Sequence, residues 1–577
     1  MHRSYYWGLV LGVCGVVAAG CGSVTPHSRL VAPKQAEAPV PSPTRAAASI
    51  PSPPQAIDIS AVTAAKAHAH FATGLVYEMN DDPESALKEY YEAALNDPAN
   101  EWLILEVSRR FAQHKELEKA MELLARSAER PNASGAIYAR LGAVYSQLGK
   151  TEQAVAADRT AIKRSPELLG GYQNLFVTYL QNKQSAEALK VLEEAARQEK
   201  TGAEFLLGVT DLCHAYALQY PSQKEKTDAL ARPLLERVRK LNPSNPSLRL
   251  QLAEALSRAG ETEKAAPIYV ELLGKLPDVP FMRERLRAKL ASIYLQSSDR
   301  QRATEQLQAL VRDDPTNPVA YYYLGSLAYE SEKPAEAAEY FSKVLVLKPD
   351  FEEAYYDLAL ANISLNKPGE ALEVLNKAAV KFPHNNNFPL EFYRGLAYGR
   401  QKSYPEALRH FTEAEIIAKT FNTNALSRVY FQMGSTQERM GAFDEAEKSF
   451  EQCLKLDPDF HAAQNYLGYM LAEHGWKLDK ARALIEKAVA AEPKNGAYLD
   501  SLGWVLFKLN QPKEALDYIL KAVELSPEPD ATLFDHLGDI YAAVGQPDKA
   551  KEAWAKSVKL EPNEDIQKKL QRAGSGE

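Results

Sequence analysis

The chain has 577 residues and a formal net charge of −8, with acidic and basic residues interspersed along its length. This distribution provides no basic run or face for nucleic acid, and it is typical of the solvated faces of amphipathic helices. A chain of this length usually forms several domains, unless it is built from repeats that contact only their neighbours.

Residues 1–20 predict a secretory signal peptide. Arg3 precedes an apolar run, Tyr5 to Ala19, which is shorter than the roughly 20 apolar residues that span a bilayer. The run ends in VAAGC, which resembles the bacterial lipobox, although Ala18 stands where leucine is usual. The resemblance implies that Cys21 is lipidated and becomes the mature N-terminus. An ordinary signal peptide or an uncleaved anchor is the alternative.

In bacterial lipoproteins, the residue after the lipidated cysteine influences whether the protein stays in the inner membrane or reaches the outer membrane. In such lipoproteins an aspartate there is associated with inner-membrane retention, and this chain has Gly22. The resemblance therefore implies a lipid-anchored protein of the outer membrane that faces the periplasm, in a cell with two membranes.

Residues 21–60 predict a tether. Eight prolines stand among alanine, serine and threonine in this segment. Such a composition cannot bury a core, so we expect a disordered or extended arm that reaches up to roughly 100 Å at about 3.1 Å per residue. A proline-motif ligand is the alternative.

Residues 61–564 repeat with a period of about 34 residues, as in PVAYYYLGSLAYESEKPAEAAEYFSKVLVLKPDF at positions 318–351. Apolar residues recur at helical spacing in two stretches, a short turn separates them, and proline closes most repeats. About fourteen such hairpins are predicted, with an irregularity at 203–245 and a polar insertion near residue 222. Residues 565–577 predict a capping helix and a tail.

Small residues recur at fixed places in the repeat. Alanine occupies the twentieth position throughout, and glycine often occupies the eighth. Glycine inside a helix costs about 1 kcal/mol relative to alanine, so its return predicts a close approach between the two helices of a hairpin. These glycines are Gly74, Gly142, Gly325, Gly395, Gly434, Gly468, Gly503 and Gly538.

The sequence predicts no catalytic residue. It lacks a glycine-rich phosphate loop, a paired-histidine metal motif and a Ser-His-Asp pattern, so we expect no metal, no cofactor and no small-molecule substrate. Cys213 and Cys453 lie too many repeats apart to form a disulfide, and we expect both to be buried as small apolar residues.

Motifs such as YLGSLAY, AEAAEYFSKVLVLKP and AKEAWAKSVKLEP are similar to those of the tetratricopeptide repeat family. This resemblance implies an all-α fold, a right-handed superhelical solenoid whose concave groove is lined by the first helices and binds peptides or proteins. The lipobox, tether and array together resemble bacterial envelope scaffolds. One such type is the outer-membrane adaptor of periplasmic carboxyl-terminal-processing proteases.

In repeats of this family, positions 5, 9 and 12 of the first helix point into the groove. Here these positions are aromatic in the middle of the array and acidic towards its C-terminal end, which predicts a partner with a basic segment. The alternative is that the rings pack against the next repeat. The residues are Tyr322, Tyr356, Phe392, Phe431, Asn465, Tyr469, Asp500, Trp504, Asp535 and Asp539.

The sequence thus predicts a lipid-anchored, non-enzymatic scaffold or adaptor that binds partner proteins in the cell envelope. The alternative is an accessory subunit that delivers substrates to a periplasmic protease or a cell-wall hydrolase. A glycosyltransferase that carries such repeats would need a catalytic domain, and the array leaves no residues to form one.

Overall fold

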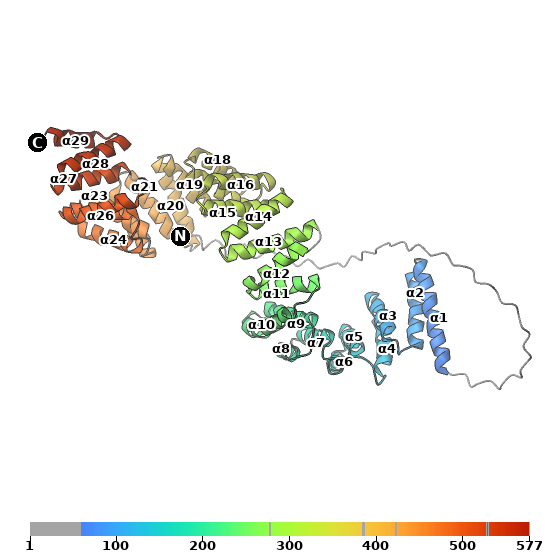
Figure 1. The fold of residues 1–577 in the computed structure, drawn as a ribbon. Coiled ribbons are helices and arrows are strands. Elements are labelled where there is room, and N and C mark those ends of the chain that lie inside the picture. Colours follow the sequence, from blue (N-terminus) through green and yellow to red (C-terminus); the bar gives the residue numbers. More distant parts are fainter. Residues whose placement is uncertain are drawn as a thin grey trace, which may run out of the picture. The chain divides into compact units, whose positions relative to one another are not determined.

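The computed structural model describes residues 59–275, 279–383, 387–421, 424–526, 528 and 530–575 (Figure 1). These residues form 29 α-helices and one 3₁₀ turn, and no strand occurs among them. The predicted all-α fold of about fourteen hairpins is confirmed. The predicted signal peptide, Cys21 and most of the tether lie outside the described residues.

Helices α1 to α28 pair in chain order into hairpins, and their bounds fall into two groups. The first group is α1 (Ile59–Met79) with α2 (Pro83–Asn96), α3 (Glu101–Gln113) with α4 (Leu117–Ala128), α5 (Gly135–Gln147) with α6 (Thr151–Arg164), α7 (Leu169–Gln181) with α8 (Ser185–Ala196), α9 (Ala203–Gln219) with α10 (Lys224–Leu241), α11 (Pro246–Arg258) with α12 (Thr262–Lys275), and α13 (Pro280–Gln296) with α14 (Arg300–Asp313).

The second group is α15 (Pro318–Glu330) with α16 (Pro334–Leu347), α17 (Glu352–Ser364) with α18 (Pro368–Lys381), α19 (Phe388–Arg400) with α20 (Tyr404–Thr420), α21 (Leu426–Arg439) with α22 (Phe443–Leu456), α23 (His461–Glu473) with α24 (Leu478–Ala491), α25 (Gly496–Lys508) with α26 (Pro512–Leu525), and α27 (Ala531–Ala543) with α28 (Pro547–Leu560). A single helix, α29 (Glu564–Ser575), follows. The polar insertion near residue 222 forms the 3₁₀ turn η1 (Pro221–Gln223) and the start of α10.

The chain divides into two compact parts, residues 1–103 and residues 104–577. In the described portion of the first part, α1 packs on α2. In the second part each hairpin packs on the next, for example α6 on α7, α16 on α17 and α26 on α27. A core of this kind continues from repeat to repeat, because each hairpin buries its apolar face against its neighbours.

The glycines at the eighth position make room for a large side chain of the same hairpin. A Cβ atom on Gly395 would lie 2.5 Å from the ring of Phe411 on the second helix. At Gly468 it would also lie 2.9 Å from the carbonyl oxygen of Ala481, so there the helix backbones themselves are close, as predicted. The ring arrangement recurs at Gly74, Gly325, Gly434 and Gly538.

First helices of neighbouring hairpins lie closer together than second helices do. Within residues 104–577, first helices are in contact in the pairs α5–α7, α7–α9, α9–α11, α15–α17, α17–α19, α19–α21, α21–α23, α23–α25 and α25–α27. Among the described second helices, only α8 and α10 come comparably close. Helices on the inner side of a curved stack are the ones that converge, so the first helices line the concave side. We call this surface the inner face.

Candidate functional site: the inner face of the first helices

Polar side chains on the inner face bond from one first helix to the next. The Tyr322 hydroxyl of α15 donates to an Asp357 carboxylate oxygen of α17 at 2.8 Å. Towards the N-terminal side, Arg258 of α11 pairs with Asp211 of α9, and Arg285 of α13 pairs with Glu254 of α11. These bonds hold neighbouring first helices at a fixed spacing, so the inner face is a connected surface.

Aromatic rings occupy the middle of the inner face, and each is partly covered by a neighbour. The Phe431 ring lies 5.1 Å from Phe460 and 5.7 Å from Tyr466, measured between ring centroids. Phe392 stacks on Phe388 at 5.5 Å, and Tyr322 lies 4.7 Å from Phe351, which directly precedes α17. All three predicted rings remain partly exposed. They combine inter-helix packing with an accessible edge.

Tyr356 is placed differently from the other predicted rings. It is only 7% exposed. Its hydroxyl donates to Glu352 at 2.7 Å and accepts a hydrogen bond from the buried Asn387 amide, which also caps α19. Tyr356 therefore serves the packing between α17 and α19, which was the alternative interpretation of these rings. It offers little surface to a partner.

Three of the predicted residues gather around His536, a side chain that the sequence does not single out. The Trp504 ring stacks on the His536 ring with centroids 3.9 Å apart, and the Tyr469 ring lies 6.1 Å away. Asp500 lies 2.9 Å from His536 Nδ1. Trp504 is 5% exposed, and its Nε1 donates to Glu473 at 2.7 Å. Trp504 is thus a packing residue between α23, α25 and α27.

Another predicted residue, Asn465, lies partly buried on α23. Its Oδ1 is buried and has no hydrogen-bond partner within the described residues. Nearby, burial and the carboxylates of Glu473 and Asp500 raise the pKa of the Tyr469 hydroxyl. Glu473 and Asp500 thus place carboxylate groups near the Tyr469 ring.

The acidic pair Asp535 and Asp539 is bound by a cation of the chain itself. Lys569 of α29 places its Nζ 2.8 Å from Asp535 Oδ1 and 2.8 Å from both oxygens of Asp539. Burial lowers the pKa of Lys569, but its bonds to the two carboxylates outweigh this and raise it. Lys569 of α29 thus neutralises part of the charge of this acidic pair.

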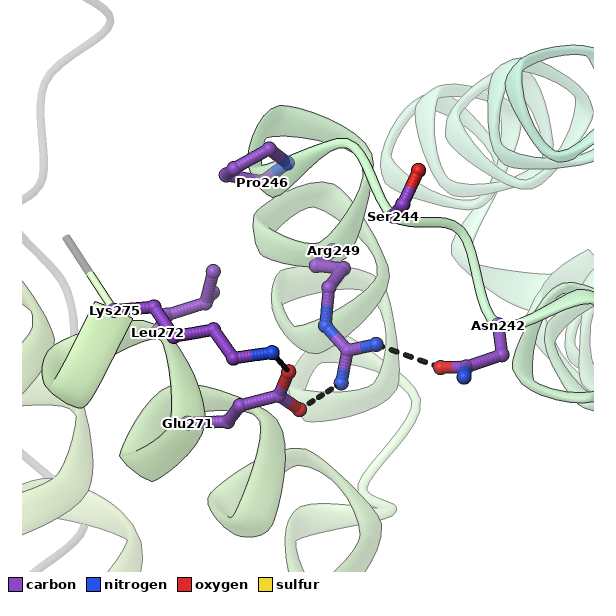
Figure 2. Close-up of a pocket in the computed structure, with 7 residues that line it drawn as sticks. All are labelled: Asn242, Ser244, Pro246, Arg249, Glu271, Leu272 and Lys275. Carbon is purple, nitrogen blue, oxygen red and sulfur yellow. Dashed lines mark hydrogen bonds and ion pairs between the residues drawn. The ribbon is translucent and has the colours of Figure 1, made fainter.

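A cavity of about 250 Å³ opens at the junction of α10, α11 and α12 (Figure 2). Arg249 and Lys275 both reach towards the carboxylate of Glu271, which Lys275 contacts at 2.7 Å. Arg249 also donates to the Asn242 side chain at 2.6 Å. The charged side chains that line this cavity are thus paired with one another. Its remaining lining residues are Ser244, Pro246 and Leu272.

Comparison with protein families identifies the repeat. Models described as tetratricopeptide repeat match residues 135–168, 229–290 and 275–553. Together these matches cover more than half of the chain. The chain is a tetratricopeptide repeat protein. Proteins of this class are scaffolds that bind other proteins. No curated protein matches the sequence.

Among solved structures, this tetratricopeptide repeat protein is similar to the APC/C hetero-tetramer Cut9-Hcn1, at 14% identity and a TM-score of 0.40 over 83% of this chain and 98% of that one. It is similar to yeast Tom70, at 16% identity and a TM-score of 0.32 over 83% and 96%. It is also similar to a tetratricopeptide repeat protein of Parabacteroides merdae, at 16% identity and 0.35 over 44% and 98%.

Four side chains that the sequence analysis does not identify each bond to a predicted residue about one repeat away. They are Lys569, His536, Glu473 and Asn387. Lys569 lies 34 residues after Asp535, so the register continues into α29, and His536 lies 36 residues after Asp500. A search for bonding pairs one repeat apart would have found both. Glu473 and Asn387 pair with Trp504 and Tyr356 across 31 residues.

Among the described residues, no group of His, Cys, Asp and Glu could hold a metal ion. No described helix is both long and apolar enough to cross a bilayer. Cys213 and Cys453 are unlinked and buried, as predicted, and burial raises the pKa of each thiol to about 12.

Proposed function

We propose that this tetratricopeptide repeat protein is a scaffold that binds a partner protein along the inner face, with a basic segment of the partner at α23 to α27. The observation that carries the proposal is the connected surface between the first helices, on which partly exposed aromatic rings are followed by the carboxylates of Glu473, Asp500, Asp535 and Asp539. Aromatic side chains dominate binding hot spots. Charge complementarity sets the orientation and association rate of a partner.

The choice of residues for a test follows from their burial. Tyr356 and Trp504 are too buried to report on binding, because their truncation would disturb the fold. Asp535 and Asp539 are partly exposed, and substitution by asparagine removes the charge while it keeps the shape. Glu373 of α18 and Glu413 of α20 are exposed acidic residues on second helices, so they provide a matched control.

We expect Asp535→Asn with Asp539→Asn to weaken partner binding at low salt, with a smaller difference at high salt because exposed charges are screened. The measurement is capture of partner proteins from detergent-solubilised membranes on the immobilised chain, quantified by mass spectrometry at two salt concentrations. Glu373→Gln with Glu413→Gln should leave the captured set unchanged. Equal losses with both pairs would contradict a role for the inner face.

We also propose that the protein is anchored to a membrane by lipid on Cys21, at the periplasmic side of the outer membrane. The support is the lipobox-like segment VAAGC followed by Gly22. Cys21→Ala should abolish incorporation of labelled fatty acid and move the protein from the membrane to the soluble fraction. Wild-type protein that takes up no label would refute the anchor.

The more specific role is that of an adaptor, in which the inner face delivers substrates to a periplasmic protease or a cell-wall hydrolase. The support is the combination of lipobox, tether and repeat array in one chain. Such an enzyme should be present among the proteins that the wild type captures in the experiment above.

A further inference from the structure

Asp158 occupies a position that is apolar in the comparable hairpins. In the hairpins with glycine at the eighth position, the facing residue of the second helix is a large side chain, such as Phe341 against Gly325. In the α5–α6 hairpin that residue is Asp158, which is 0% exposed. Its carboxylate lies against Gly142, where an added Cβ would come within 2.2 Å of Oδ1. A carboxyl group thus fills a core position.

The carboxyl group has little compensation for its burial. The Asn174 side chain of α7 donates to Asp158 Oδ1 at 3.2 Å and also to the Ala139 carbonyl oxygen at 2.6 Å. Asp158 Oδ2 is buried and has no hydrogen-bond partner in the described structure. A buried charge without a counter-ion is costly, so the group is expected to remain neutral where it can.

Neighbouring titratable groups do not supply a counter-charge. On its own helix, Arg159 pairs instead with Glu194 of α8. None of the titratable side chains on the two helices packed against α6 is bonded to the Asp158 carboxyl among the described contacts. These side chains are Tyr138, Arg140 and Tyr145 of α5, and Tyr172 and Tyr179 of α7.

Burial raises the pKa of Asp158 to about 8, although the Asn174 bond opposes the shift. The unfolded group has an ordinary pKa near 3.8. Between these values the folded hairpin holds a proton that the open chain releases, so stability falls as pH rises through this window. Below it both states are protonated, and above it both are ionised, so the dependence ends at either side.

We propose that Asp158 makes the α5–α6 hairpin a pH-responsive element of the array: the folded hairpin keeps the carboxyl proton, opening releases it, and the hairpin therefore opens more readily as the pH rises. The hairpin adjoins an apolar cluster that includes Ile162, one turn further along α6, and extends to Leu327. A rise in pH would therefore loosen the array at one end of this cluster.

The test is amide hydrogen exchange of the full chain between pH 5 and pH 9, followed in peptides from residues 135–181 and corrected for intrinsic exchange rates. In the wild type we expect the opening equilibrium of this segment to rise tenfold or more between pH 5 and pH 8. In Asp158→Asn, which cannot ionise, it should change less than twofold. Peptides from α23 to α26 serve as an internal control.

Asp158→Ile is a second variant that cannot ionise, for use if Asp158→Asn folds poorly. Isoleucine already faces a glycine at Gly468 and Gly503, through Ile485 and Ile519. This variant should fold, exchange more slowly than the wild type at pH 8, and lack the local pH dependence. A wild type without the rise, or a variant that retains it, would overturn the proposal.

Discussion

Trp504→Ala is expected to lower the stability of the C-terminal hairpins by about 3–5 kcal/mol, the usual cost of truncating a buried tryptophan. The side chain is 5% exposed, stacks on Phe507 and His536, and donates to Glu473. Its loss would leave a cavity between three successive first helices and one unpaired carboxylate. Urea unfolding followed by circular dichroism should show an earlier C-terminal transition, since long arrays need not unfold in one step.

Two variants separate packing from the hydrogen bond. Trp504→Phe keeps an aromatic ring but loses the bond to Glu473, so it should cost about 1–3 kcal/mol. Trp476→Ala is the matched control, because Trp476 is 43% exposed, and it should shift unfolding much less. If Trp504→Ala unfolds like the wild type, its side chain is not part of the core. Contact of Trp504 with a partner, which the sequence predicts, would then be favoured.

Gly395→Ala is expected to destabilise the α19–α20 hairpin by about 1–3 kcal/mol, the range for overpacked cores. Its new methyl group would lie 2.5 Å from the Phe411 ring, which is itself fully buried and cannot easily move. The control lies in the same helix. Gly399 has open space around the corresponding Cβ, so Gly399→Ala should be neutral or should stabilise by up to about 1 kcal/mol through helix propensity.

Gly395→Ala is expected to lower the stability of the hairpin, whereas Gly399→Ala is expected to leave it unchanged or raise it. Thermal unfolding of both variants measures this difference. A smaller facing side chain should restore part of the loss, so Gly395→Ala with Phe411→Leu should be more stable than Gly395→Ala alone. The chain already contains such a pair, Ala359 and Leu375, both buried one repeat earlier. Equal effects at Gly395 and Gly399 would refute the proposed reason for the glycine.

Much of the fold can be predicted from the sequence because every repeat places apolar and small residues at the same positions. The spacing of Ala337, Phe341 and Val344 identifies one face of a helix, and recurrence of the pattern gives the number of hairpins. Spacing alone does not give the depth of a side chain. Tyr322 and Tyr356 occupy the same position of consecutive repeats, yet only Tyr356 is buried.

Depth depends on side chains one repeat away. Tyr356 is covered where the Asn387 side chain bridges to it, and Trp504 is covered by His536. For the same reason the acidic end was predicted from Asp535 and Asp539, but its neutralisation by Lys569 was not. That lysine belongs to α29, which the sequence had identified only as a polar cap.

The most direct test of the inner face is site-specific photo-crosslinking in living cells. Ser364 and Arg439 are exposed, and each bonds to a tyrosine of a neighbouring first helix, which places them on the inner face. Val380 of α18 and Ile416 of α20 are 85% and 53% exposed on second helices. A photoreactive residue at Ser364 or Arg439 should capture the partner protein, and one at Val380 or Ile416 should not. Capture from the second helices alone would contradict binding along the inner face.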